Sequence, residues 1–135
     1  MAIPSSWAAP PPVETSRNER QLLGSGAEAR AARHLRAAGL EVLQQNYRCR
    51  MGELDIVALE GQLLVVAEVR LRSSTRFGGA AASITPAKQR RIVRATRHLL
   101  ARHPALQRLP VRFDAVLVPP RNDSVEWIRG AFDAF

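Results

Sequence analysis

Two consecutive apolar runs constrain the fold of this 135-residue chain more than any other feature. Residues 52–59 (GELDIVAL) and 62–72 (QLLVVAEVRLR) are rich in Leu, Ile and Val, and the dipeptide Glu60-Gly61 between them is a turn signal. Branched aliphatic runs that flank a two-residue turn are typical of paired strands. We therefore predict an antiparallel hairpin in which Leu59 faces Gln62 across the turn.

Charged side chains interrupt both apolar runs. An unpaired carboxylate inside a buried strand costs several kcal/mol, so Asp55 and Glu68 require a cationic partner. Side chains alternate between faces with a period of two, and a slip of one residue would place the two acids on opposite faces. In the predicted register, the side chains that share one face are Glu53, Asp55, Glu68, Arg70 and Arg72.

Two interpretations of this charged face remain open. The carboxylates and guanidinium groups can form an ion-pair network that braces the sheet. Alternatively, Asp55 and Glu68 bind a divalent cation, because Mg²⁺ is commonly held by one or two carboxylates together with water and substrate phosphate.

The rest of the chain predicts further helices and strands. Ala27, Ala31, Leu35 and Ala38 give the first helix an apolar face, Gly39 ends it, and Thr85 caps the second helix. The expected elements are helices at 25–38 and 86–102, an edge strand at 40–48, a loop at 73–85, and strands at 111–118 and 124–129.

The two predicted helices carry the remaining candidate site residues. Glu28 lies near the edge of the first apolar face, so we expect it to point toward the sheet. On the second helix, Arg90, Arg91 and Arg94 fall outside the apolar stripe and should be solvated. Lys88 is the single lysine among 20 basic residues. It is either one more solvated charge or a cation that reaches the acidic face from the helix.

Composition bounds the class of protein. The net charge of +8 suggests a polyanionic partner, with nucleic acid the first candidate and Arg90, Arg91 and Arg94 as its contacts. One cysteine, Cys49, excludes an intrachain disulfide and fits a reducing cytoplasm. No segment approaches the length of a membrane helix, so no membrane association is expected. We expect residues 1–20 to be a disordered leader and residues 21–135 to be one domain.

A series of short motifs follows one order along the chain. They are Gly24-Ser25-Gly26-Ala27-Glu28, Gly52-Glu53-Leu54-Asp55, Glu68-Val69-Arg70-Leu71-Arg72, Phe77-Gly78, Lys88-Gln89-Arg90-Arg91 and Arg112-Phe113-Asp114. This series resembles the YraN-like family of uncharacterised bacterial proteins. The resemblance covers roughly residues 22–135, and its motifs are specific as a set.

That family is in turn similar to the PD-(D/E)xK nuclease superfamily and its archaeal Holliday junction resolvases. The resemblance implies an α/β fold of restriction-endonuclease-like architecture, with a mixed central sheet flanked by helices. It implies that Asp55 and Glu68 bind Mg²⁺ or Mn²⁺ and that Glu28 contributes through water. Arg70 stands where the superfamily has a lysine. Arginine stabilises negative charge but stays protonated, so Lys88 is the alternative candidate for the missing role.

The resulting expectation is a metal-dependent endonuclease that hydrolyses phosphodiester bonds in branched or single-stranded DNA. Two competing classes remain open: a nucleic-acid-binding module of the same fold without turnover, and a protein-interaction scaffold. Metal-dependent cleavage separates the first class from the others, and salt-sensitive binding without cleavage separates the second from the third.

Overall fold

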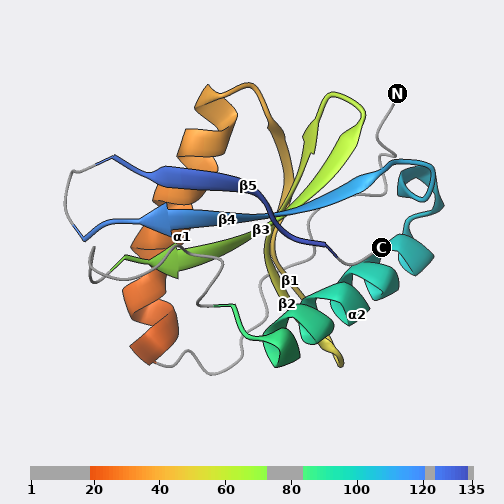
Figure 1. Cartoon of the computed structure of the whole chain (residues 1–135), viewed down its shortest axis with the longest axis horizontal. Coiled ribbons are helices and arrows are strands. Elements are labelled where there is room, and N and C mark those ends of the chain that lie inside the picture. Colours follow the sequence, from red (N-terminus) through yellow and green to blue (C-terminus); the bar gives the residue numbers. More distant parts are fainter. Residues whose placement is uncertain (1–18, 73–83, 121–123, 134–135) are drawn as a thin grey trace.

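The computed structural model describes residues 19–72, 84–120 and 124–133, which form one five-stranded sheet with a helix on each face (Figure 1). The strands lie in the order β1-β2-β3-β4-β5, and only β3 and β4 run parallel. The predicted mixed α/β fold is therefore confirmed. The bounds are α1 Glu19–Ala37, β1 Glu41–Cys49, β2 Gly52–Glu60, β3 Leu63–Leu71, α2 Pro86–Arg102, the 3₁₀ turn η2 Pro104–Leu106, β4 Val111–Val118 and β5 Glu126–Phe132.

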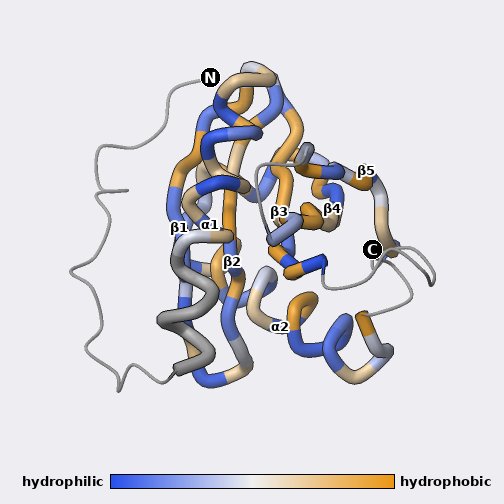
Figure 2. The backbone as a smooth tube through the Cα atoms, turned by 90° about the vertical axis from the view of Figure 1, so that its left-hand side faces the viewer, coloured by the Kyte–Doolittle hydropathy of each residue, from blue (hydrophilic) through white to orange (hydrophobic). Residues whose placement is uncertain are grey.

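Two apolar clusters fix the helices against the sheet. Helix α2 packs through Ile92, Ala95 and Leu99 on one face, in a cluster that includes Leu64 and Val66. Helix α1 packs on the other face through three buried alanines and Leu35. Figure 2 shows that the apolar residues concentrate along β2, β3 and β4, which are covered on both sides. Each apolar side chain buried in this way contributes about 1.5–3 kcal/mol.

The hairpin of β2 and β3 turns one residue later than predicted. Glu60 pairs with Leu63, so Gly61 and Gln62 form the turn. Gly61 has a φ of +61°, which is the left-handed region that glycine adopts without a steric penalty, whereas Glu60 would be disfavoured there. The partner of Leu59 is consequently Leu64 rather than Gln62. This shift of two residues leaves every side chain on its predicted face.

Helix α1 differs from its predicted span. It begins at Glu19 rather than at residue 25, so Gly24, Ser25 and Gly26 lie inside the helix. Ala38 is exposed rather than buried, since the chain leaves the helix after Ala37 and turns at Gly39 with a φ of +100°. Residues 1–18 of the predicted leader and 73–83 of the predicted loop lie outside the described residues.

The remaining predictions are accurate to within a few residues. Helix α2 has the predicted bounds, and the Thr85 hydroxyl accepts a hydrogen bond from the Lys88 N–H, which confirms the N-cap. Strand β1 lies at the edge of the sheet as expected. Strand β5 begins and ends later than the predicted 124–129, because Gly130 is accommodated at a register irregularity opposite β4 instead of ending the strand.

Candidate active site

The site lies where β2 and β3 separate. Their regular pairing runs from the turn to Ile56 and Ala67 and stops there. One residue further along, Asp55 lies opposite Glu68, and its Oδ2 accepts a hydrogen bond of 2.8 Å from the Val69 N–H. The carboxylate thus replaces a backbone carbonyl as the partner of that N–H. Beyond this point β2 continues beside β1 and β3 beside β4, and Figure 1 shows the two pairs diverging.

Glu68 is the more deeply buried of the two acids. The residue is only 1% exposed, and its Oε2 has no hydrogen-bond partner among the described residues. Burial and the nearby Asp55 carboxylate together raise the pKa of Glu68 to about 8. Burial also raises the pKa of Asp55, although the hydrogen bond from Val69 opposes the shift. Two like charges in one buried site disfavour simultaneous ionisation.

Helix α2 supplies a cation to this pair. The Lys88 Nζ lies 3.4 Å from the Glu68 Oε1, and its side chain is 34% exposed. Lys88 therefore reaches the acidic face from the helix and is not simply a solvated charge. Arg70, half-buried on the same strand as Glu68, lowers the pKa of that carboxyl by its charge. Lys88 and Arg70 offset part of the desolvation of Glu68, but among the described residues its Oε2 still has no hydrogen-bond partner.

Glu28 approaches from helix α1. Its side chain is half-buried, and burial together with the Asp55 charge raises its pKa. No group of three or more His, Cys, Asp or Glu side chains gathers in a metal-holding arrangement within residues 19–72, 84–120 and 124–133. The site is therefore a pair of carboxylates, Asp55 and Glu68, with Glu28 as a neighbour rather than a third member of a compact ligand set.

Asn46 belongs to the site and was not predicted from the sequence. Gln45 pairs with Ile56 and Tyr47 with Leu54, so Asn46 lies opposite Asp55 in the next strand. Its side chain hydrogen-bonds Glu28, which lowers the pKa of that carboxyl. Asn46 has a φ of +58°, the left-handed conformation that asparagine tolerates better than most residues. The asparagine thus joins β1 to α1 beside the acid pair.

Replacing Asn46 tests the contribution of this backbone conformation. Asn46→Ala and Asn46→Gly both remove the hydrogen bond to Glu28, but only glycine keeps a relaxed left-handed backbone. We expect the alanine variant to have a free energy of unfolding about 1 kcal/mol lower than the glycine variant. Urea unfolding of the two variants measures the difference. Equal stabilities would show that the left-handed conformation carries no penalty here.

The other charged residues of the predicted face have partners elsewhere. Glu53 lies 3.6 Å from Arg48 of β1, and Arg72 lies 3.4 Å from Glu126 of β5. These two ion pairs are partly exposed at the surface, where such contacts contribute little to stability. Ion pairs that brace the sheet are therefore found at the margins of the charged face, while Asp55 and Glu68 form its buried centre.

The predicted arginine trio is divided between two flanks of α2. Arg90, Arg91 and Arg94 are all exposed, as expected. Arg90 and Arg94 line a groove on one flank. Arg91 lies on the other flank, where a Cβ at Gly52 would meet its carbonyl oxygen at 3.4 Å. That distance is an ordinary van der Waals contact, so α2 packs directly against the start of β2, and glycine is favoured at position 52 by its φ of +153°.

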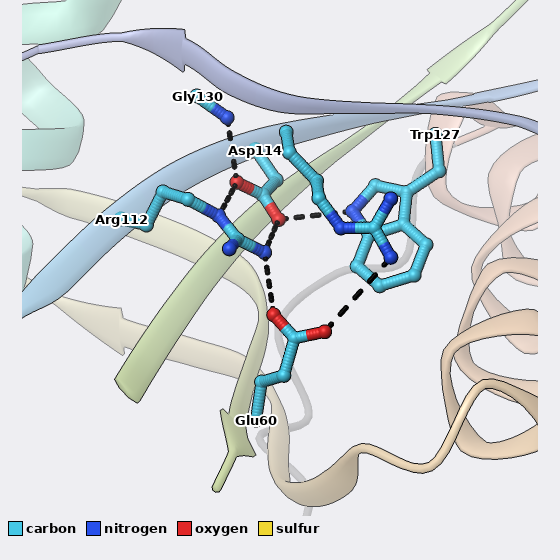
Figure 3. Close-up of polar contacts among 6 residues, drawn as sticks. Glu60, Arg112, Asp114, Trp127 and Gly130 are labelled. Carbon is cyan, nitrogen blue, oxygen red and sulfur yellow. Dashed lines mark hydrogen bonds and ion pairs between the residues drawn. The ribbon is translucent and has the colours of Figure 1, made fainter. Parts of the chain in front are cut away.

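A second buried acid, Asp114, is structural. Arg112 donates two hydrogen bonds of 2.8 Å to its carboxylate, and Trp127 Nε1 and the Gly130 N–H donate one each (Figure 3). Arg112 also contacts Glu60 at 3.0 Å. Because both oxygens of Asp114 are satisfied by protein donors, this carboxylate has no free capacity for a ligand. It ties β4 to β5 through Trp127 and Gly130.

The sheet, its two covering helices and the acids at the split hairpin define an α/β protein of restriction-endonuclease-like architecture. Comparison with known proteins is more specific. The model of the uncharacterised protein family UPF0102 matches residues 27–118, and the chain belongs to this YraN-like family. The match includes Glu28, Asp55, Glu68 and Lys88, and it confirms the family resemblance.

This chain aligns with nearly the whole length of its curated relatives. A UPF0102 protein of Nitrosomonas europaea is 54% identical over 111 residues, covering 82% of this chain and 92% of the relative. One of Cupriavidus taiwanensis is 54% identical over 123 residues, with 89% of each chain covered. One of Legionella pneumophila is 40% identical over 111 residues, covering 82% of this chain and 94% of the relative. No helix within the described ranges is long and apolar enough to cross a membrane.

Proposed function

We propose that this protein is a metal-dependent endonuclease that hydrolyses phosphodiester bonds in DNA. The observation that carries the proposal is the buried Glu68, whose Oε2 has no hydrogen-bond partner within the described part of the chain although the residue lies beside Asp55 at a splayed hairpin. Native proteins rarely bury a carboxylate oxygen without a partner, so such an atom calls for an explanation. A cation shared with Asp55 supplies one.

The donor set fits Mg²⁺ or Mn²⁺. Both acids offer hard oxygen ligands, and Mg²⁺ is usually held by one or two carboxylates with water and substrate phosphates completing its shell. Asp55 and Glu68 would hold the ion, and Glu28 is placed to orient water beside it. When bound, the ion neutralises charge on the scissile phosphate and lowers the pKa of its water.

The cationic side chains have a separate part in the proposed mechanism. Lys88 and Arg70 lie beside Glu68 and provide fixed positive charge where negative charge develops on the phosphate. Lysine is the better candidate for proton transfer, because its pKa shifts on burial whereas arginine remains protonated. In this proposal Lys88, on helix α2, takes the role that Arg70 cannot perform.

One observation favours a second candidate, a nucleic-acid-binding module without turnover. The ion pair between Lys88 and Glu68 already offsets one of the two buried negative charges within the protein itself. A site compensated in this way has less need of an ion. The two candidates share the fold and a basic DNA-binding surface with Arg90, Arg91 and Arg94, and they differ only in metal binding and cleavage.

One experiment separates these functions. The full chain is incubated with linear, flapped and four-way DNA, with Mn²⁺ or with EDTA, and both binding and cleavage are measured. The proposal expects cleavage of at least one substrate with Mn²⁺ and none with EDTA. Salt-sensitive binding without cleavage would support the binding module instead. No binding even at low salt would contradict both candidates and favour an interaction scaffold in the cytoplasm.

A further inference from the structure

The outer flank of α2 forms a groove with the chain that follows β5. Three arginines, Arg90, Arg94 and Arg97, line it together with Gln89, Val93 and Asp133. All three arginines are exposed along the helix. Asp133, which directly follows β5, lies on the other side of the groove from the helix. Asp133 is the acid that faces these arginines across the groove, so the lining is predominantly cationic.

The spacing of the three arginines places them in one row. Residues three and four apart share a face of a helix, so Arg90, Arg94 and Arg97 follow one another along the groove. At a rise of 1.5 Å per residue, the row is about 10 Å long. Arg91 is excluded from the row, because its backbone lies against Gly52 on the opposite flank. The row is therefore a property of the folded helix and not of the basic sequence as a whole.

We propose that this groove binds consecutive phosphates of one nucleic-acid strand, an inference that rests on the nucleic-acid ligand of the proposed function. Each arginine of the row can neutralise one phosphate, so the row suits a short run of consecutive phosphates on one strand. Guanidinium groups pair with phosphate in a bidentate geometry, which favours arginine at such contacts. Among the described lining residues there is no aromatic side chain to stack on a base. Contacts to phosphate carry no sequence information directly, so binding through the arginine row should be independent of sequence.

The position of the groove relates this surface to the acid pair. Gln89 lines the groove, and the adjacent Lys88 turns to the inner side of the helix to meet Glu68. A strand that follows the arginine row toward the start of α2 thus arrives beside Lys88. This arrangement favours a nucleic acid over an acidic protein, because the same helix presents both the phosphate row and the cation of the proposed active site.

Fluorescence anisotropy of labelled DNA tests the proposal with the full chain in EDTA, where cleavage is prevented. The test variant is Arg90→Gln/Arg94→Gln/Arg97→Gln. The matched control, Arg33→Gln/Arg36→Gln/Arg108→Gln, removes the same charge from exposed arginines outside the groove. We expect the groove variant to bind at least about tenfold more weakly at 0.1 M salt and to lose about two to three units of salt slope. The control should change affinity by less than about threefold. Circular dichroism and thermal melts verify that both variants fold.

Every outcome of this comparison decides the proposal. Equal losses in the two variants would reduce the effect to net charge and overturn it, and so would an unchanged groove variant. Single-stranded and duplex arms distinguish the source of the phosphates. An acidic peptide of equal charge that displaces DNA more strongly than unlabelled DNA does would assign the groove to a protein partner. Because binding is measured in EDTA, failure to detect cleavage in the Mn²⁺ assay refutes the nuclease and leaves this result standing.

Discussion

Asp55→Asn and Glu68→Gln should each lower Mn²⁺-dependent cleavage by about 100-fold or more. Each substitution keeps the size of the side chain but removes a charged oxygen ligand, and even residues that only support a metal ligand often contribute 10- to 100-fold to activity. Both variants should also lose the rise in melting temperature that Mn²⁺ produces in the parent protein, because an ion that binds only the folded state stabilises it by linkage. Initial rates and thermal melts measure the two effects.

Glu53→Gln is the matched control for these variants. Glu53 lies on the same strand as Asp55 but is partly exposed and paired with Arg48, so its substitution should change cleavage by less than about threefold. In the same assay, Lys88→Ala should resemble the acid variants, and Arg70→Lys should add little because Lys88 already supplies the cation. An unchanged response to Mn²⁺ in both acid variants would show that the metal binds elsewhere and would end the proposed assignment of this site.

The pairing of the two acids on one face could be predicted from the sequence even though the turn was wrong. A period of two makes the shared face insensitive to a shift of two residues, and moving the turn by one residue, to Gly61 and Gln62, shifts the cross-strand pairing by that amount. The bounds of α2 were equally accessible, because Thr85 and Pro86 are a strong local signal for a helix start.

Other features of the site depend on contacts between distant segments. Nothing in the strand-like sequence around Asn46 signals its left-handed backbone, since that conformation arises where the residue meets Glu28 of another element. The direction of Lys88 depends on how closely α2 approaches β2 at Gly52. The division of the arginines between two flanks could not be predicted from the sequence, because it depends on which side of α2 lines the groove with Asp133. Arg90 and Arg94 are on that side.

Stability should fall as pH rises from about 5 to about 8 when no metal is present. Glu68 is the reason, because its pKa is raised from 4.5 to about 8 in the folded protein. Between these two values the folded state holds a proton that the unfolded state has released, so the free energy of unfolding decreases with pH. Each unit of pKa difference corresponds to about 1.4 kcal/mol, so the rise from 4.5 to about 8 amounts to roughly 5 kcal/mol.

Glu68→Gln isolates this contribution, because glutamine is neutral at every pH. In EDTA we expect urea unfolding to give similar stabilities for parent and variant near pH 5, and a variant that is more stable by several kcal/mol near pH 8.5. Parallel pH profiles for the two proteins would contradict the raised pKa. Adding Mg²⁺ near pH 8.5 should recover stability in the parent but not in the variant, since the ion stabilises the ionised carboxylate pair that glutamine cannot form. The same buried charge that weakens the metal-free protein would then be the group that binds the ion.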